Sequence, residues 1–219
     1  MDTSDVDAAE AEDGAGNQER AGAAAVRTFE LSDVAVTEVA SSVPTVSEAT
    51  LKHRAGREAS ETLSSILVGV GGGPHSGATV DFARGLAAEA DAWLELFHVV
   101  PASEGNAETS TADADEGREA TDGDARRPID ERGERLLSAA GDRLDEFDCV
   151  DRWMVEGESP ADAIVEQSAY YDAVVVGAST TGAVGRFVFS CTTDVVVDNA
   201  AAPVIVVEAD GSTDLVGDT

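Results

Sequence analysis

Short apolar runs that alternate with helical patterns constrain the fold of this chain more than any other feature. The runs are nearly continuous in apolar residues, which is typical of strands buried on both faces of a sheet. They lie at residues 66–70, 92–100, 149–155, 173–177 and 203–207. Between them, apolar residues recur three and four positions apart, as on one face of a helix. This alternation predicts an α/β fold, a doubly wound three-layer sandwich around a five-stranded parallel sheet.

A sheet of this kind binds ligands at the carboxyl ends of its strands, where the strand order reverses. The first predicted strand is followed by a glycine-rich turn at residues 71–76, and the fourth is followed by a loop at 177–190. We therefore expect a crevice between these two loops. Ser76 is the expected N-cap of the helix after the turn, and Ser159 is expected to cap a later helix that opens with Pro160.

Standard catalytic and nucleotide motifs are mostly absent from the sequence. The only lysine is Lys52, so no phosphate-binding loop with the Gly-Lys-Ser/Thr ending exists. A dinucleotide fingerprint that starts at Gly69 fails because Pro74 takes its sixth position. The three His and two Cys are too scattered for a metal site. We predict no catalytic residue and no metal ligand.

The charge of the chain is strongly acidic, with 44 Asp and Glu against 14 Lys and Arg and a net charge of −30. Such a chain repels phosphate backbones and anionic lipid surfaces, so neither nucleic acid nor a membrane surface is an expected partner. The largest share of the excess follows residue 128, in the patterned part of the chain. Molar salt screens carboxylate repulsion, so we interpret the acidity and the scarcity of Lys as adaptation to high salt, typical of a halophile.

The domain organisation follows from where the apolar pattern is present. Residues 1–63 are predicted to be an acidic, mostly disordered extension with a docking segment, or alternatively the remnant of an upstream domain. Residues 64–210 form the predicted α/β domain, with an acidic disordered insertion at 102–127 and a disordered tail at 211–219. No apolar stretch approaches the roughly 18 residues of a membrane span, and no secretory signal is visible. With only two Cys, we expect a cytoplasmic protein.

Several segments of residues 64–210 resemble the universal stress protein family, of the UspA-like type. The stretch ILVGVGGGPHSGATVDFARGLA resembles the opening strand, turn and helix of that family, and WLELFHVV resembles its second strand. The part of the family from its third to its fourth strand is resembled by VEGESPADAIVEQSAYYDAVVVGAS. Its final loop, helix and strand are resembled by GAVGRFVFSCTTDVVVDNAAAPVIVVEA. The resemblance implies the adenine-nucleotide alpha-hydrolase-like fold.

The resemblance also implies a nucleotide site, with ATP or AMP as the cofactor. ATP-binding members carry Gly-x2-Gly-x9-Gly-Ser/Thr after the fourth strand, and here only Gly177 matches the pattern. The adenine-contacting Asp of the family falls on Gly71. Nucleotide binding is therefore expected to be weak or lost. The candidate cofactor-binding residues are the positions of this degenerate loop and its surroundings: Gly71, Val176, Gly177, Thr180, Gly182, Ser190, Cys191, Thr192 and Thr193.

The resemblance implies a regulatory or stress-response protein that forms a homodimer through its last strand, at residues 203–208. An uncovered apolar edge strand there would promote aggregation, which agrees with a paired edge. One alternative is an ATP-binding or ATP-hydrolysing member of the same fold. Another is a regulatory domain that serves a membrane transporter, with residues 1–63 as its docking arm.

Several single residues could take part in catalysis or binding, but each has a simpler structural interpretation. We expect His75 to be a solvated turn residue, and His98 to be a packed and hydrogen-bonded strand residue. Arg186, the one base after Arg152, is expected to be solvated or paired with a surface acid. Trp93 and Trp153 are expected to pack in the core or at the sheet edge.

Overall fold

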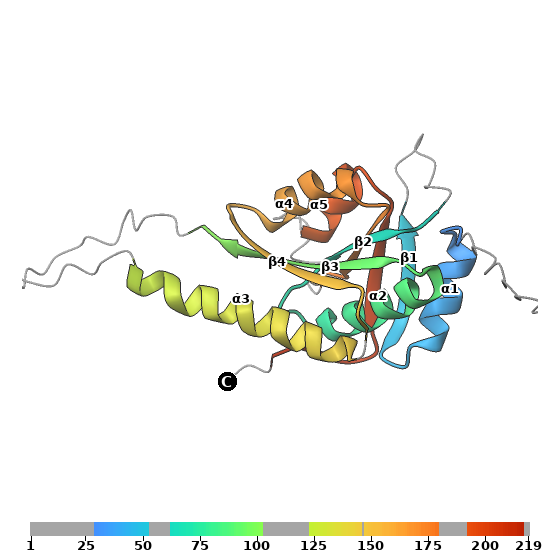
Figure 1. Ribbon diagram of the computed structural model, residues 1–219, viewed down its shortest axis with the longest axis horizontal. Coiled ribbons are helices and arrows are strands. Elements are labelled where there is room, and N and C mark those ends of the chain that lie inside the picture. Colours follow the sequence, from blue (N-terminus) through green and yellow to red (C-terminus); the bar gives the residue numbers. More distant parts are fainter. Residues whose placement is uncertain (1–28, 53–61, 103–122, 146, 180–191, 217–219) are drawn as a thin grey trace, which may run out of the picture.

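The computed structural model describes residues 29–52, 62–102, 123–145, 147–179 and 192–216 (Figure 1). Its elements follow the chain in this order: α1 (Asp33–Ser42), β1 (Val46–Lys52), β2 (Ser65–Gly69), α2 (Ser76–Ala90), β3 (Trp93–Pro101), α3 (Gly123–Leu144), β4 (Val150–Gly157), α4 (Pro160–Gln167), the 3₁₀ turn η1 (Ser168–Tyr170), β5 (Ala173–Gly177), α5 (Thr192–Asn199) and β6 (Val204–Ala209). All five strands predicted from the apolar runs are present, within two residues at each end.

The sheet has six strands in the order β1-β6-β5-β2-β3-β4. The five predicted strands run parallel to their neighbours, whereas β1 runs antiparallel to β6. The predicted α/β sandwich is thus confirmed, and the prediction of five strands is corrected to six. The chain passes outward from β2 to β3 and β4, then returns to the other side of β2 for β5 and β6. The strand order therefore reverses between β2 and β5.

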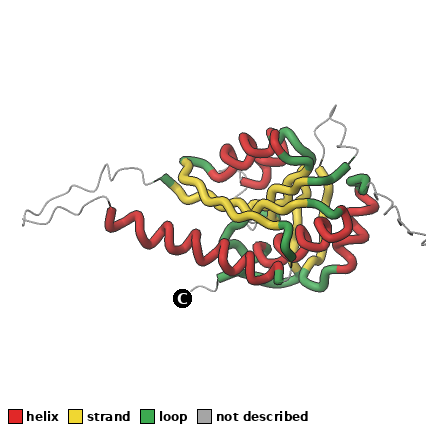
Figure 2. Tube along the Cα trace, in the orientation of Figure 1, coloured by secondary structure: helices red, strands yellow, loops and turns green. Residues whose placement is uncertain are grey.

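Helices cover both faces of the sheet, as Figures 1 and 2 show. α1, α2 and α3 lie on one face, and α4 and α5 lie on the other. Successive side chains of a strand point to opposite faces of the sheet, so β2 contributes to the hydrophobic core on each face. Ile66 and Val68 belong to the cluster under α1–α3, whereas Leu67 belongs to the cluster under α4 and α5. All three are fully buried.

Part of the segment before the family-like region, residues 29–52, folds as α1 and β1 and packs on the α/β domain. Ser32 caps α1 by accepting a hydrogen bond from the Ala35 amide at 3.3 Å. β1 then pairs with β6 from Val46 opposite Ala209 to Lys52 opposite Val204. An edge strand needs only one apolar face, which here packs under α1.

This pairing corrects the prediction of a homodimer through residues 203–208. β6 is bonded to β5 on one side and to β1 on the other, so neither of its edges is free for a second copy. The chain covers its own apolar edge strand instead. β1 is the new edge strand, and its exposed residues are polar, among them Ser47, Glu48 and Lys52. Polar and charged side chains on an edge strand discourage pairing between molecules.

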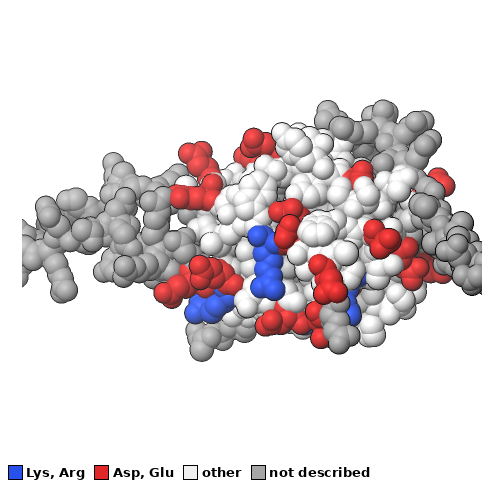
Figure 3. Space-filling model, viewed as in Figure 1, with Lys and Arg blue, Asp and Glu red and all other residues white. Residues whose placement is uncertain are grey.

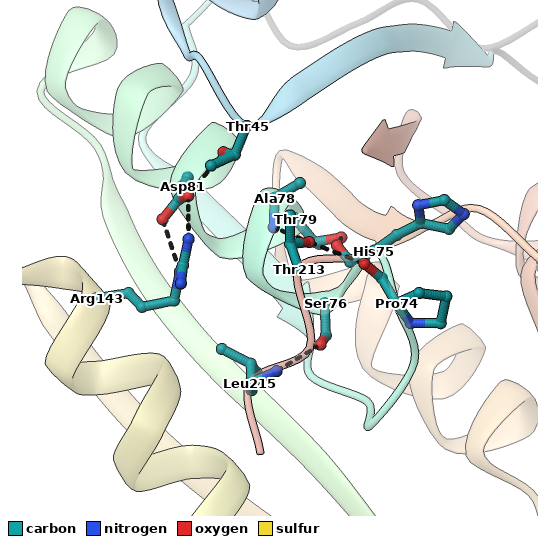
Figure 4. A network of polar contacts seen from close by, with 10 residues as sticks. All are labelled: Thr45, Pro74, His75, Ser76, Ala78, Thr79, Asp81, Arg143, Thr213 and Leu215. Atoms are coloured by element: carbon teal, nitrogen blue, oxygen red, sulfur yellow. Dashed lines mark hydrogen bonds and ion pairs between the residues drawn. The ribbon is translucent and has the colours of Figure 1, made fainter. Parts of the chain in front are cut away.

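The surface seen in Figure 3 carries acidic side chains scattered over several elements, with few basic ones among them. Arg143 of α3 is paired with Asp81 of α2. Its Nε lies 2.9 Å from Oδ1 of Asp81 and its Nη2 lies 2.5 Å from Oδ2. Hydrogen bonding to Asp81 raises the pKa of Arg143. Thr45, between α1 and β1, donates to the same carboxylate at 2.7 Å (Figure 4), so Asp81 connects three elements.

A second carboxylate joins β2 and β5 at their amino ends, opposite the edge where the crevice is expected. Asp172 accepts hydrogen bonds from the backbone amides of Ser64 and Ser65 at 2.9 and 3.0 Å. The two serine hydroxyls donate to the same oxygen at 2.7 and 3.1 Å. Burial raises the pKa of Asp172, but these hydrogen bonds outweigh it, so the pKa lies below its ordinary value of 3.8.

Substitution of Leu51 in β1 tests whether β1 keeps the molecule from self-association. Leu51 is 6% exposed in the core under α1, so Leu51→Asp should detach β1 because an unpaired carboxylate is costly to bury. The bare edge of β6 should then pair with other copies. We expect light scattering to show a mass that rises with concentration. Ser47→Asp, on an exposed position of β1, should keep the mass of the wild-type protein. A Leu51→Asp protein with the wild-type mass and native circular dichroism would contradict this role of β1.

Asp172→Asn tests the carboxylate that joins β2 and β5. A pKa lowered by folding adds stability above the unfolded-state value of 3.8, and that stability is lost as the pH falls through the folded-state pKa. The variant should lose about 1–2 kcal/mol of unfolding free energy at pH 7. The deficit should shrink as the pH drops below about 4. Urea unfolding of both proteins across this pH range measures it, and a deficit that is independent of pH would contradict the assignment.

Candidate functional site

A crevice of about 520 Å³ opens at the carboxyl ends of β2 and β5, where the strand order reverses. This position confirms the expectation from the sequence for doubly wound sheets. The turn after β2 contributes Gly71, Gly73, His75 and Ser76, and the end of β5 contributes Gly177 with the two residues that follow it.

The walls of the crevice are mainly apolar. They comprise side chains from β3, β5 and α4 and from the residue that follows β2: Val70, Phe97, Val99, Pro160, Ile164 and Val176. Hydroxyl groups lie among them at Ser76, Thr79, Ser179, Thr192 and Thr193. Apolar walls with a few polar groups are typical of small-molecule sites, in which the polar groups orient the ligand.

The described lining of the crevice contains no Asp, Glu, Lys or Arg, and its titratable side chains are His75 and His98. Nδ1 of His98 lies 2.8 Å from the carbonyl oxygen of Val70. A carbonyl only accepts, so Nδ1 carries the proton. The prediction of a packed, hydrogen-bonded His98 is confirmed, and α3 lies directly against this ring at Gly133.

His75 is not the solvated turn residue that the sequence suggested. Its Nδ1 accepts a hydrogen bond from the backbone amide of Ala209 at 3.0 Å, so the ring proton sits on Nε2. His75 also occupies the N-cap position of α2 but makes no capping bond with its side chain. The predicted cap, Ser76, is instead the buried first residue of the helix.

Close approach of α2 to the end of β5 explains why residue 177 is a glycine. A Cβ at this position would lie 3.0 Å from Oγ1 of Thr79 and 3.3 Å from Cβ of His75. The Thr79 hydroxyl itself donates a hydrogen bond to the carbonyl oxygen of His75 at 2.7 Å. On the other side, the Thr193 hydroxyl donates to the Gly177 carbonyl at 2.9 Å and joins α5 to the same point.

The N-terminus of α2 does not offer free amide groups to an anion. The Gly77 amide donates to the carbonyl oxygen of Thr213 at 2.8 Å, and the Ala78 amide donates to the hydroxyl of the same residue at 3.0 Å (Figure 4). The Ser76 amide donates to the Gly73 carbonyl at 3.0 Å. A segment after β6 thus caps a helix end that often binds phosphate in proteins of this architecture.

Arg132 of α3 is a cation near the site that the sequence pattern does not reveal. A Cβ on Gly72 would lie 3.3 Å from its Nη2, so the guanidinium lies beside the glycine-rich turn. Sixty residues separate the two positions, and no local pattern connects them. Only the packing of α3 against β3 and β4 brings this charge to the turn.

The structure brings five of the predicted cofactor-binding residues to one crevice, namely Gly71, Val176, Gly177, Thr192 and Thr193. The other four, Thr180, Gly182, Ser190 and Cys191, lie outside the described residues, as does Arg186. No group of three or more metal-ligating side chains occurs in the described part of the chain. None of the helices described there combines the length and apolarity needed to cross a bilayer.

The tryptophans lie at strand positions, in agreement with sheet-edge packing. Trp153 of the edge strand β4 is 38% exposed, and its ring lies 5.3 Å from that of Phe97. Trp93 begins β3 and is 42% exposed. Neither is among the described lining of the crevice.

Residues 62–208 match the model of the universal stress protein family, and the chain belongs to that family. Among solved structures, UspA from Lactobacillus plantarum is similar, with 22% identity and a TM-score of 0.51, over 67% of this chain and 99% of that one. A universal stress protein in complex with cAMP is similar with 20% identity and a TM-score of 0.53, over 68% and 99%. A family member from Burkholderia pseudomallei reaches 23% and 0.50, over 67% and 97%. No curated protein matches the chain.

Gly177→Val tests the contact between α2 and β5. The added side chain would press on Thr79 and His75, and overpacking of this kind costs roughly 1–3 kcal/mol. Gly71→Ala is the control, because a Cβ there meets nothing within 4 Å. We expect chemical denaturation to show a clear loss of unfolding free energy for Gly177→Val and little change for Gly71→Ala. Equal stability of the two variants would contradict the close approach.

Proposed function

We propose that this protein is a non-enzymatic regulatory member of the universal stress protein family that binds AMP or ATP weakly. The observation that carries the proposal is the crevice itself, with apolar walls, several hydroxyls and no charged side chain in its described lining. A flat, uncharged adenine ring fits between walls such as Val70, Val99 and Ile164. The hydroxyls suit the ribose.

The proposed affinity is weak because the phosphates find few partners. The amides of Gly77 and Ala78 are already bonded to Thr213, so α2 offers them no binding site. Among the described residues near the crevice, Thr192 at the start of α5 and the exposed Arg132 beside the glycine-rich turn could still donate, whereas the Thr193 hydroxyl already donates to the Gly177 carbonyl. The degenerate loop pattern after Gly177 points the same way. One of the similar universal stress proteins forms a complex with cAMP, which supports an adenine nucleotide as the class to test.

Hydrolysis is not part of the proposal. Phosphoryl transfer depends on positioned cations that neutralise the developing charge and on a group that orients the attacking water. Within the described lining, the groups that could transfer a proton are hydroxyls and two histidines. His98 and His75 each have one ring nitrogen engaged with a backbone group.

The nucleotide proposal is tested by titrating adenosine, AMP, ADP and ATP in molar KCl, with thermal shift and phosphate release as readouts. We expect stabilisation by millimolar AMP, little further gain with ADP or ATP, and no phosphate release. Adenosine should bind almost as well as AMP, because the apolar walls supply most of the contact. Val176→Asp should abolish binding, whereas Lys52→Ala, far from the crevice in β1, should not change it. Absence of any shift, or turnover of ATP, would refute the proposal.

We also propose that the acidic surface adapts the protein to high salt. Acidic side chains lie scattered over the described surface seen in Figure 3, and the net charge of −30 belongs to the chain as a whole. At about 1 M salt the Debye length is near 3 Å, so repulsion between carboxylates further apart than this is largely screened.

A thermal melt in dilute buffer and in molar KCl tests the salt proposal. We expect the midpoint to rise by tens of degrees with KCl because screening removes self-repulsion in the folded state. Sucrose at equal osmolality serves as the control, since it stabilises by exclusion from the surface without screening charge. A midpoint that does not depend on KCl, or that responds equally to sucrose, would overturn the interpretation.

A further inference from the structure

We propose that residues 210–215 form a detachable strap, which together with the last residue of β6 holds the 71–76 turn in the conformation that lines the crevice. Its attachment and ligand binding in the crevice are therefore thermodynamically coupled. The coupling rests on the proposed nucleotide binding, whereas the holding of the turn does not. The strap lies wholly beyond the segment that matches the family model, which ends at residue 208.

Thr213 is the centre of the strap and bonds to both sides of the start of α2. Its carbonyl and hydroxyl oxygens accept from the Gly77 and Ala78 amides at 2.8 and 3.0 Å. Its own amide and hydroxyl donate to the Pro74 carbonyl at 2.7 and 2.9 Å. One residue thus supplies two acceptors to the helix and two donors to the turn (Figure 4).

Residues on either side of Thr213 fix two crevice-lining side chains. The Ala209 amide donates to Nδ1 of His75 at 3.0 Å, and the Leu215 amide donates to Oγ of Ser76 at 3.3 Å. Both His75 and Ser76 line the crevice. The strap consequently determines how the turn presents these side chains to a ligand, although Thr213 itself is not among the described lining residues.

The fit of the strap at Gly77 is too close for any side chain. A Cβ at this position would overlap the carbonyl oxygen of Thr213 and would lie 3.1 Å from Cζ of Arg143. In an isolated helix, Ala is more stable than Gly by about 1 kcal/mol. Gly77→Ala is therefore expected to stabilise α2 unless the strap occupies this place. If Gly77→Ala lowers the free energy of unfolding, the strap is attached at this place; if it raises that free energy, the strap is not attached there.

The strap is suited to detach without unfolding the domain. Its Gly211, Ser212 and Asp214 are exposed or only partly covered, and Thr213 and Leu215 are half-buried. The strap is held by hydrogen bonds near the surface and by the packing of half-buried Leu215 against the core under α1–α3. A segment with so little buried apolar surface opens at lower free energy than core strands do. A ligand that binds more tightly when the strap holds the turn must stabilise the attached strap. By the same factor, detachment of the strap must lower the affinity of the crevice for that ligand.

The test uses the full-length chain and two variants that release the strap, each with a matched control. Gly77→Ala is compared with Gly73→Ala, because a Cβ at Gly73 meets nothing within 4 Å. Thr213→Pro, which removes the donated amide and the hydroxyl, is compared with Val34→Ala, at a 76% exposed position of α1 outside the strap. Hydrogen exchange is followed by mass spectrometry without ligand in molar KCl, and AMP binding is then measured by calorimetry.

We expect the release variants to raise exchange about tenfold in residues 71–79, the factor that 1.4 kcal/mol of lost protection gives, with no change in β3 or α4. AMP affinity should fall in the same two variants and stay at the wild-type level in the Val34→Ala control. If hydrogen exchange across residues 71–79 is unchanged in both release variants, the proposal that the strap holds the turn is wrong, whatever the AMP affinities are. Equal AMP affinity in wild type and release variants would overturn the coupling. Failure of the wild-type chain to bind AMP would refute the proposed function alone, since the exchange result still decides the strap.

Discussion

The position of α2 against the centre of the sheet is the contact on which the rest of the structure depends. Its first turn comes so close to the end of β5 that a Cβ at residue 177 would lie 3.0 Å from Oγ1 of Thr79, and this approach forms one side of the crevice. Farther along the same helix, Asp81 binds Arg143 of α3 and Thr45 before β1. The start of the helix receives Thr213. Both segments that flank the family-like region therefore dock on α2, one at each of these two places.

Coverage of the apolar sheet explains what the flanking segments do for stability. A parallel sheet with helices on both faces still has two edges, and β6 is a highly apolar strand. Pairing with β1 satisfies the outer edge of β6 within one molecule, and α1 covers the apolar face of β1. The outer edge of β6 is thus covered by a strand of the same chain rather than by a second copy. The new edge at β1 carries exposed polar residues, which limits further pairing.

The crevice combines features that differ in how far they could be predicted. Its location followed from the strand order, because the carboxyl ends of parallel strands meet where that order reverses. Gly71, Val176, Gly177, Thr192 and Thr193 were predicted as cofactor-binding residues from the resemblance to the universal stress protein family, and all five line the crevice. Arg132 and the strap at Thr213 were not predicted, since neither lies near the turn in sequence. The partners of Asp81 and Ala78 lie 36 and 135 positions away from them.

The sequence by itself determined the five parallel strands, the helices between them and the place of the crevice. These follow from local periodicity, because a strand buried on both faces and a helix with one apolar face each leave a short-range pattern. Only the tertiary structure decided that residues 33–52 add a sixth strand, that the tail caps α2, and that His75 accepts from Ala209. Such contacts depend on which surfaces the folded core leaves open, and a single hydroxyl or amide that fills them leaves no periodic signal in the chain.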